Sequence, residues 1–133
     1  MKKISVMMLA VLMIISSCMT VYAAVPETIV PLWENISSIN CTLTFDGTDG
    51  LGQGIAKGLS GTTRMSGTVT VYVQTPSGWE EVGSASNTVS GRLLSVSVNF
   101  DGETGEYYKA VFEVTCVRNG VSESDSWTAY KTC

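Results

Sequence analysis

The sequence contains no histidine, and this absence limits its chemistry more than any other feature. Histidine is the base of Ser-His-Asp and Cys-His catalytic sites and a frequent ligand in zinc and iron sites. Those enzyme classes and most such metal sites are therefore excluded. No glycine-rich loop follows a strand pattern and opens a helix pattern, so a nucleotide-phosphate loop is excluded as well. We predict no cofactor.

Basic residues are scarce, at 8 against 12 acidic residues in a chain of 133. Without a basic patch the chain cannot neutralise a row of phosphates, which argues against a nucleic-acid partner. The acidic residues that follow two predicted strands do not have the spacing of a dedicated calcium loop. We expect them to form turns, and we predict no metal site among Asp46, Asp49, Asp101 and Glu103.

The apolar run at the N-terminus is too short to cross a bilayer as a helix, which takes about 20 residues. It extends from Ile4 to Ile15, after Lys2 and Lys3, and a small-residue cleavage site ends at Ala23. This is the layout of a secretory signal peptide. We predict a cleaved signal peptide at 1–23, an extended leader at 24–36 and a folded domain at 37–133 of a secreted protein.

A second interpretation of the N-terminus stays open. The residues that end at Cys18 loosely resemble a bacterial lipobox, in which this cysteine is acylated and becomes the new N-terminus. The protein would then be anchored to the cell surface by lipid, with residues 19–36 as its tether. A membrane is a partner only in this case.

The clearest folding signal is a β-hairpin within residues 105–130. Apolar and polar residues alternate along its first arm, which is the period of a half-buried strand. Asn119 and Gly120 then supply the adjacent positive-φ residues that a type I′ turn requires. This turn sets the register, and the predicted pairs are Arg118 with Val121, Phe112 with Trp127, and Ala110 with Ala129.

Similar alternation predicts five further strands, and no segment has a helical period. We expect them at Ser38 to Phe45, Leu51 to Leu59, Met65 to Val73, Trp79 to Ser84 and Leu94 to Phe100, with residues 84–90 as a polar loop. The turn after Val73 predicts that Tyr72 opposes Glu81 and that Val71 opposes Val82. About seven short strands separated by turns indicate an all-β, antiparallel sandwich.

Two segments carry a family resemblance. Val69-Thr70-Val71-Tyr72 followed by Gly78-Trp79-Glu80-Glu81-Val82 resembles the third strand and its hairpin partner in fibronectin type III and immunoglobulin-like domains. Gly105-Glu106-Tyr107-Tyr108-Lys109-Ala110 resembles the start of their sixth strand. The resemblance implies an immunoglobulin-like sandwich with a tyrosine corner at Tyr107 or Tyr108. The whole chain also resembles small secreted Firmicutes proteins, which implies a bacterial, extracellular setting.

Three cysteines remain after the predicted cleavage, namely Cys41, Cys116 and Cys133. In an oxidising compartment they suggest one disulfide and one leftover thiol. We expect Cys41 to pair with Cys116, since both occupy the apolar phase of their strands and fall toward one end of a seven-strand sandwich. If the strand of Cys41 is instead the second of the sandwich, its partner becomes Cys133.

One exposed sheet face is the predicted binding surface. By register it carries Tyr72, Trp79, Tyr107 and Tyr130 among serine and threonine hydroxyls, a mixture that suits sugar stacking or a protein interface. Strands also favour aromatic residues, so these side chains are otherwise scattered surface residues or cover for the leader. We predict a secreted or surface-attached, non-catalytic module in which this face is the candidate site for a protein or a glycan. The alternatives are a cell-envelope spacer without a ligand, or a small hydrolase that uses Glu123 and Asp125, two carboxylates on one face of a strand.

Overall fold

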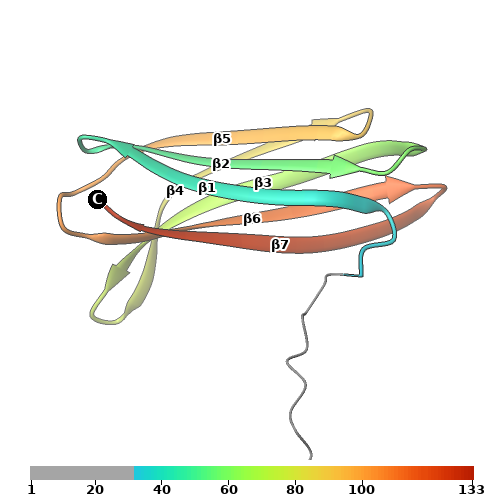
Figure 1. The fold of residues 1–133 in the computed structure, drawn as a ribbon. Helices are drawn as coiled ribbons and strands as arrows, with labels where there is room; N and C mark the ends of the chain where they lie inside the picture. The colour runs from blue at the N-terminus through green and yellow to red at the C-terminus, as the bar shows by residue number, and fades with distance from the viewer. Residues whose placement is uncertain (1–31) are drawn as a thin grey trace, which may run out of the picture. The chain divides into compact units, whose positions relative to one another are not determined.

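The computed structural model describes residues 32–133, which form two antiparallel β-sheets packed face to face (Figure 1). The seven strands are β1 (Ile36–Asp46), β2 (Asp49–Gly58), β3 (Thr62–Thr75), β4 (Gly78–Val89), β5 (Leu93–Asp101), β6 (Tyr107–Arg118) and β7 (Val121–Thr132). The predicted all-β sandwich is therefore confirmed. The predicted signal peptide, its cleavage site and Cys18 lie outside the described residues.

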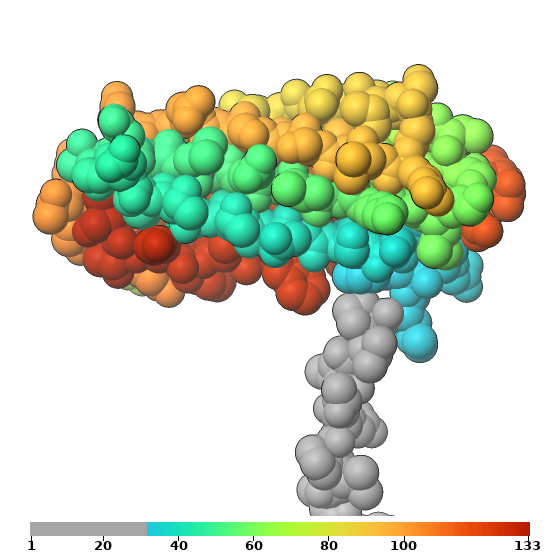
Figure 2. Space-filling view, turned by 45° about the horizontal axis from the view of Figure 1, so that its top comes forward, coloured from blue at the N-terminus to red at the C-terminus, as the bar shows by residue number. Residues whose placement is uncertain are grey.

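The strands are divided between the sheets as in an immunoglobulin-like sandwich. One sheet has the order β1-β2-β5 and the other β4-β3-β6-β7. Figure 2 shows the strands of the first sheet side by side, with β7 along one border and β4 along the other. The four-stranded sheet is the one for which the sequence predicted an exposed aromatic face.

The hairpin of β6 and β7 has the predicted register. Arg118 pairs with Val121, Phe112 with Trp127 and Ala110 with Ala129. Asn119 and Gly120 have φ values of 53° and 76°, as a type I′ turn requires. The short turn thus fixes which residues of β7 face the core.

Strand β4 is longer than predicted, because it continues through the residues expected to be a polar loop and ends at Val89. It is an edge strand that is exposed at most positions, so it needs few apolar residues and its sequence shows no hydrophobic period.

The register between β3 and β4 differs from the prediction because of a bulge beside Tyr72. Tyr72 opposes Glu81 as predicted, but Val71 opposes Gly83 instead of Val82.

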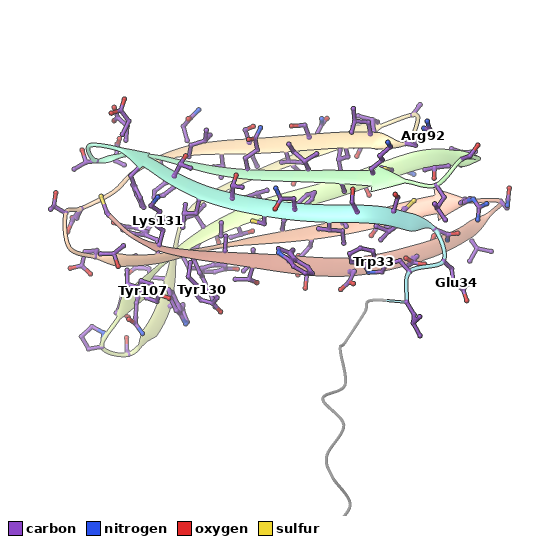
Figure 3. The ribbon with its side chains drawn as sticks, viewed as in Figure 1. Trp33, Glu34, Arg92, Tyr107, Tyr130 and Lys131 are labelled. Atoms are coloured by element: carbon purple, nitrogen blue, oxygen red, sulfur yellow. The ribbon has the colours of Figure 1, made fainter. Side chains whose placement is uncertain are left out.

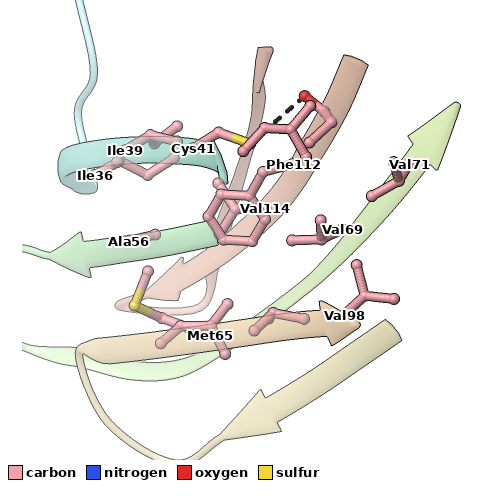
Figure 4. Packing of buried hydrophobic residues seen from close by; sticks show 14 of the residues in the cluster. Ile36, Ile39, Cys41, Ala56, Met65, Val69, Val71, Val98, Phe112 and Val114 are labelled. Atoms are coloured by element: carbon pink, nitrogen blue, oxygen red, sulfur yellow. Dashed lines mark hydrogen bonds between the residues drawn. The ribbon is translucent and has the colours of Figure 1, made fainter. Parts of the chain in front are cut away.

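Strand β2 turns its small residues, not its large ones, toward the core. Its buried positions alternate as Gly50, Gly52, Gly54, Ala56 and Gly58, while Leu51 and Ile55 face outward. Two of these glycines, Gly50 and Gly54, make room for aromatic rings of the core. A Cβ atom on Gly54 would lie 2.3 Å from Cγ of Phe112, whose ring lies among Val69, Val114 and their neighbours (Figure 4).

Tyr108 forms the tyrosine corner. Its buried hydroxyl accepts a hydrogen bond from the backbone N–H of Glu103, at 2.8 Å and five residues upstream. Tyr107, the other candidate, points to the opposite face of β6. The bond ties the loop before β6 to the core.

The predicted disulfides are absent, because Cys41, Cys116 and Cys133 are all free thiols. The Cys41 thiol donates to the carbonyl of Ala110 at 3.5 Å (Figure 4). Cys116 lies six residues further along β6, about 20 Å away at ~3.3 Å per residue, whereas a disulfide requires Cα atoms within about 7 Å. Cys133 instead lies beside the carbonyl of Gly47, at the far end of β1 from the centre where Cys41 sits. Neither predicted pair can form without moving a strand.

Candidate functional site

The four aromatic residues predicted for the binding surface gather at one end of the exposed face of the four-stranded sheet. Each comes from a different strand, β3, β4, β6 or β7, because the register places them on the same outward phase. We call Tyr72, Trp79, Tyr107 and Tyr130, together with Lys109, the aromatic platform.

Three rings of the platform, those of Trp79, Tyr107 and Tyr130, contact one another. The ring centroid of Trp79 lies 6.0 Å from the ring centroid of Tyr107 and 6.3 Å from that of Tyr130. Tyr107 and Tyr130 are stacked, with 5.9 Å between centroids and planes 14° apart. Such ring pairs stabilise one another by about 1 kcal/mol beyond their buried area. The platform is therefore a single cluster and not a set of scattered surface residues.

Lys109 is a member of the platform that sequence reasoning missed. Its Nζ lies 4.4 Å from the ring centroid of Trp79 and 5.2 Å from that of Tyr72, within cation–π range. The available signal was its position two residues after Tyr107, on the same outward phase of β6. The ammonium group thus contacts two of the rings and adds a hydrogen-bond donor to the platform.

Much of the aromatic surface remains open to solvent. The exposed fractions are 36% for Trp79, 37% for Tyr107 and 56% for Tyr130. Figure 3 shows Tyr107 and Tyr130 together beside the β3–β4 hairpin, at the end of the sheet opposite to Trp33 and Glu34. Since these rings face away from the core, packing of the core does not require aromatic residues at these positions.

A polar hollow occupies the same face beyond the platform. Its volume is about 590 Å³, and serine and threonine hydroxyls provide most of its lining. We call it the hydroxyl hollow; it is lined by Ser66, Gly67, Thr68, Ser86, Asn87, Thr88, Glu113, Val114, Thr115, Ser124, Asp125 and Ser126. Of the hydroxyl residues predicted for this face on β7, Ser124 and Ser126 line it.

The two carboxylates of the hydrolase hypothesis bind groups of the chain itself. The Glu123 carboxylate accepts from the backbone N–H groups of Glu34 at 2.7 Å, Asn35 at 2.9 Å and Ile36 at 3.4 Å. The Asp125 carboxylate accepts from the indole N–H of Trp33. These bonds dock residues 33–36, which we call the N-terminal latch, onto β7. No local pattern in the sequence indicates this pairing, because its partners lie about 90 positions apart.

Asn35 holds the latch in the core. Its backbone carbonyl accepts from the N–H of Leu59 at 2.8 Å, and its side-chain amide donates to the carbonyl of Val121 at 3.2 Å. The buried side chain thereby joins the start of β1 to the turn between β6 and β7. The latch is part of the domain fold.

Two further observations concern residues 32–133 only. No group of three or more histidine, cysteine, aspartate or glutamate side chains is arranged there to hold a metal ion. Nor does this part of the chain contain a helix long and apolar enough to cross a membrane.

No family model matches the chain, and no curated protein sequence matches it. Among solved structures, the ASH/PapD-like domain 7 of human CEP192 is similar, with 12% identity over 82% of this chain and 94% of that domain, at a TM-score of 0.48. Catalytically inactive OgpA from Akkermansia muciniphila, in complex with an O-glycopeptide, shares 16% identity over 76% of this chain and 32% of its own length, at a TM-score of 0.34. Neither likeness bears on the function of this chain.

Proposed function

We propose that this chain is a non-catalytic binding module that acts outside the cell and recognises a glycan through the aromatic platform. The observation that carries the proposal is the cluster itself: mutually contacting, half-exposed rings and one ammonium group on the solvent side of the sheet. Exposed aromatic faces are suited to stacking on the C–H faces of sugar rings, and their hydroxyl and indole groups can hydrogen-bond to sugar hydroxyls.

The surroundings of the platform favour a glycan over a protein. The hollow beside it is lined mostly by hydroxyls and includes Glu113, whereas the cores of protein interfaces are depleted in serine and glutamate. Hydroxyls both donate and accept hydrogen bonds, as sugar hydroxyls do. A polyhydroxylated ligand can therefore satisfy this surface more fully than an apolar protein patch can.

The position of the platform suits attachment at the other end of the domain. The chain enters the sandwich through the N-terminal latch, next to the β6–β7 turn, while Tyr130 lies toward the far end of β7 (Figure 3). The platform therefore lies at the end of the domain opposite to the latch. This arrangement leaves the rings accessible to an external ligand.

The contacts of Glu123 and Asp125 support a non-catalytic role. A glycosidase needs two carboxyl groups free to face a sugar across a cleft. Here Glu123 caps three backbone N–H groups and Asp125 binds an indole. Docking of the latch explains why Glu123 and Asp125 lie on one face of β7, so their placement does not favour the hydrolase alternative.

A glycan array tests the proposal, with Trp79→Ala as the platform variant and Trp127→Ala as the matched control. Trp127 is also a half-exposed tryptophan, at 44%, but it lies on the other phase of the sheet. We expect binding of a glycan that Trp79→Ala abolishes and Trp127→Ala keeps, with both variants still folded at the temperature of the assay. Absence of binding to every glycan and mucin on the array would contradict the proposal and favour the spacer; a protein ligand that requires Trp79 would reassign the platform.

The external location is tested by mass spectrometry of the protein exported from a bacterial host. We expect a mature chain that begins at Ala24. An acyl group on Cys18 would instead show lipid anchoring at the cell surface, and an uncleaved chain retained inside the cell would contradict export.

A further inference from the structure

The hydroxyl hollow is built from two rows of side chains that cross all four strands of the sheet. One row is Ser86, Thr68, Glu113 and Ser126, and each residue is the register partner of the next. The adjacent row is Thr88, Ser66, Thr115 and Ser124. Glu113 is the one charged member of these two rows, and it lies on β6, between hydroxyls of its neighbouring strands.

The hydroxyls of the hollow are already held in place. Thr68 and Ser86 share a hydrogen bond at 2.7 Å, and Thr115 and Ser124 share another at 2.7 Å. Each pair uses one hydroxyl proton, so one donor and several lone pairs remain for a ligand. Glu113 is exposed, and its carboxylate accepts hydrogen bonds. Preorganised polar groups of this kind lower the entropy cost of binding.

We propose that the hydroxyl hollow is a second subsite of the same glycan-binding surface. It binds a neutral sugar unit of the glycan whose other units lie on the aromatic platform. This inference rests on the proposed function of the platform. In the subsite, the Glu113 carboxylate accepts hydrogen bonds from two neighbouring hydroxyls of the sugar, while the paired hydroxyls of β3, β4, β6 and β7 bond to its remaining polar groups. A carboxylate on the ligand would be repelled by Glu113, which selects against acidic sugars.

The spacing of the two subsites sets the length of the ligand. Lys109 of the platform and Glu113 of the hollow are four residues apart on β6, or about 13 Å at ~3.3 Å per residue. A single sugar reaches only one of these groups. We therefore infer that the ligand is an extended oligosaccharide, and that its affinity rises with chain length until both subsites are filled.

Calorimetric titration of the full-length mature protein tests this inference. The probes are β-1,4-linked oligomers of glucose, xylose, mannose and N-acetylglucosamine, from one to six units. In the native protein we expect affinity to rise with length. In Glu113→Gln we expect the longest bound oligomer to lose about tenfold or more in affinity, as for loss of a charged hydrogen bond, while the shortest bound oligomer keeps its affinity.

Two further variants separate the possible outcomes. Ser124→Ala should lower the affinity for the long oligomer without changing the affinity for the short one. Glu80→Gln removes a carboxylate on the other phase of β4 and should change neither affinity. If Glu113→Gln and Ser124→Ala bind long oligomers like the native protein while Trp79→Ala does not, the subsite is refuted and the platform stands. If no oligomer binds the native protein, the subsite for a neutral oligosaccharide is refuted, and the platform fails with it only if the glycan array also shows no binding.

Discussion

The ring of Phe112 occupies the space in which a side chain on Gly54 would lie. A Cβ atom at this position would approach Cγ of the ring to 2.3 Å and both Cδ atoms to 2.6 Å or less. Gly54 lies in the central strand of the three-stranded sheet and Phe112 in a central strand of the other. The pair therefore sets the distance between the sheets at the middle of the core.

Replacing Gly54 by alanine should destabilise the domain by about 1–3 kcal/mol or more, because Phe112 is fully buried and has no free space to move into. Urea denaturation measures the change. The control is Gln53→Ala on the outward face of the same strand, for which we expect less than about 0.5 kcal/mol. Equal stability of the two variants would contradict the packing described for β2.

Removal of the Glu123 carboxylate should release the N-terminal latch. In Glu123→Ala, the backbone N–H groups of Glu34, Asn35 and Ile36 lose their acceptor, and we expect a cost of about 1–3 kcal/mol. Hydrogen exchange of these amides should accelerate more than that of β6. Glu80→Ala, an exposed carboxylate on β4, serves as the control and should leave the same amides protected.

The tyrosine corner predicts that two adjacent tyrosines respond differently to loss of the hydroxyl. Tyr108→Phe leaves the N–H of Glu103 without its partner and should cost about 1 kcal/mol of unfolding free energy. Tyr107→Phe keeps the ring of the platform and should change stability by less than about 0.5 kcal/mol. A larger effect at Tyr107 would reverse the assignment.

The cysteines should differ in reactivity. Alkylation of the native protein, followed by peptide mapping, should label Cys133 and spare the buried Cys41 and Cys116 until the protein is denatured. Recovery of a disulfide between Cys41 and either of the other two would contradict the strand positions.

Burial raises the pKa of the Cys41 thiol above its ordinary value of 9.0, and hydrogen bonds with the backbone of Ala129 and Phe112 oppose this rise. The unfolded chain therefore loses this proton at a lower pH than the folded domain does. The resulting stability is fully present below about pH 9 and is lost as the pH rises through the folded pKa. Unfolding titrations across this window should show the loss, and Cys41→Ala should reduce it.

Much of the four-stranded sheet could be predicted because its signals are local. The alternation along β6 and the turn at Asn119 and Gly120 determine the register of β7, and this register places Tyr107 and Tyr130 on the outward face. The platform followed from these facts and from the opposition of Tyr72 and Glu81. Lys109 was missed because a lysine on an exposed phase is ordinary until its ring partners are known.

The remaining features depend on contacts between segments that are distant in the sequence. Alternating glycines in β2 weaken a strand signal, and they are explained only by side chains of other strands that fill their space, among them the rings of Phe100 and Phe112. The pairing of Cys41 was wrong for the same reason: its thiol lies against Ala110 of β6 and not against Cys116, and this depends on how strands of the two sheets lie against each other. Local sequence patterns do not predict which distant residues contact each other.

The most direct test of glycan binding at the aromatic platform uses the indole N–H signals of the three tryptophans, Trp33, Trp79 and Trp127, in a nuclear magnetic resonance titration. The probe is the array glycan that binds best or, without one, the neutral oligomers named above. We predict that the Trp79 signal shifts with saturation, while the signal of Trp127, on the other phase, stays in place. Movement of Trp33 or Trp127 without Trp79, or no movement with any probe, would contradict the account.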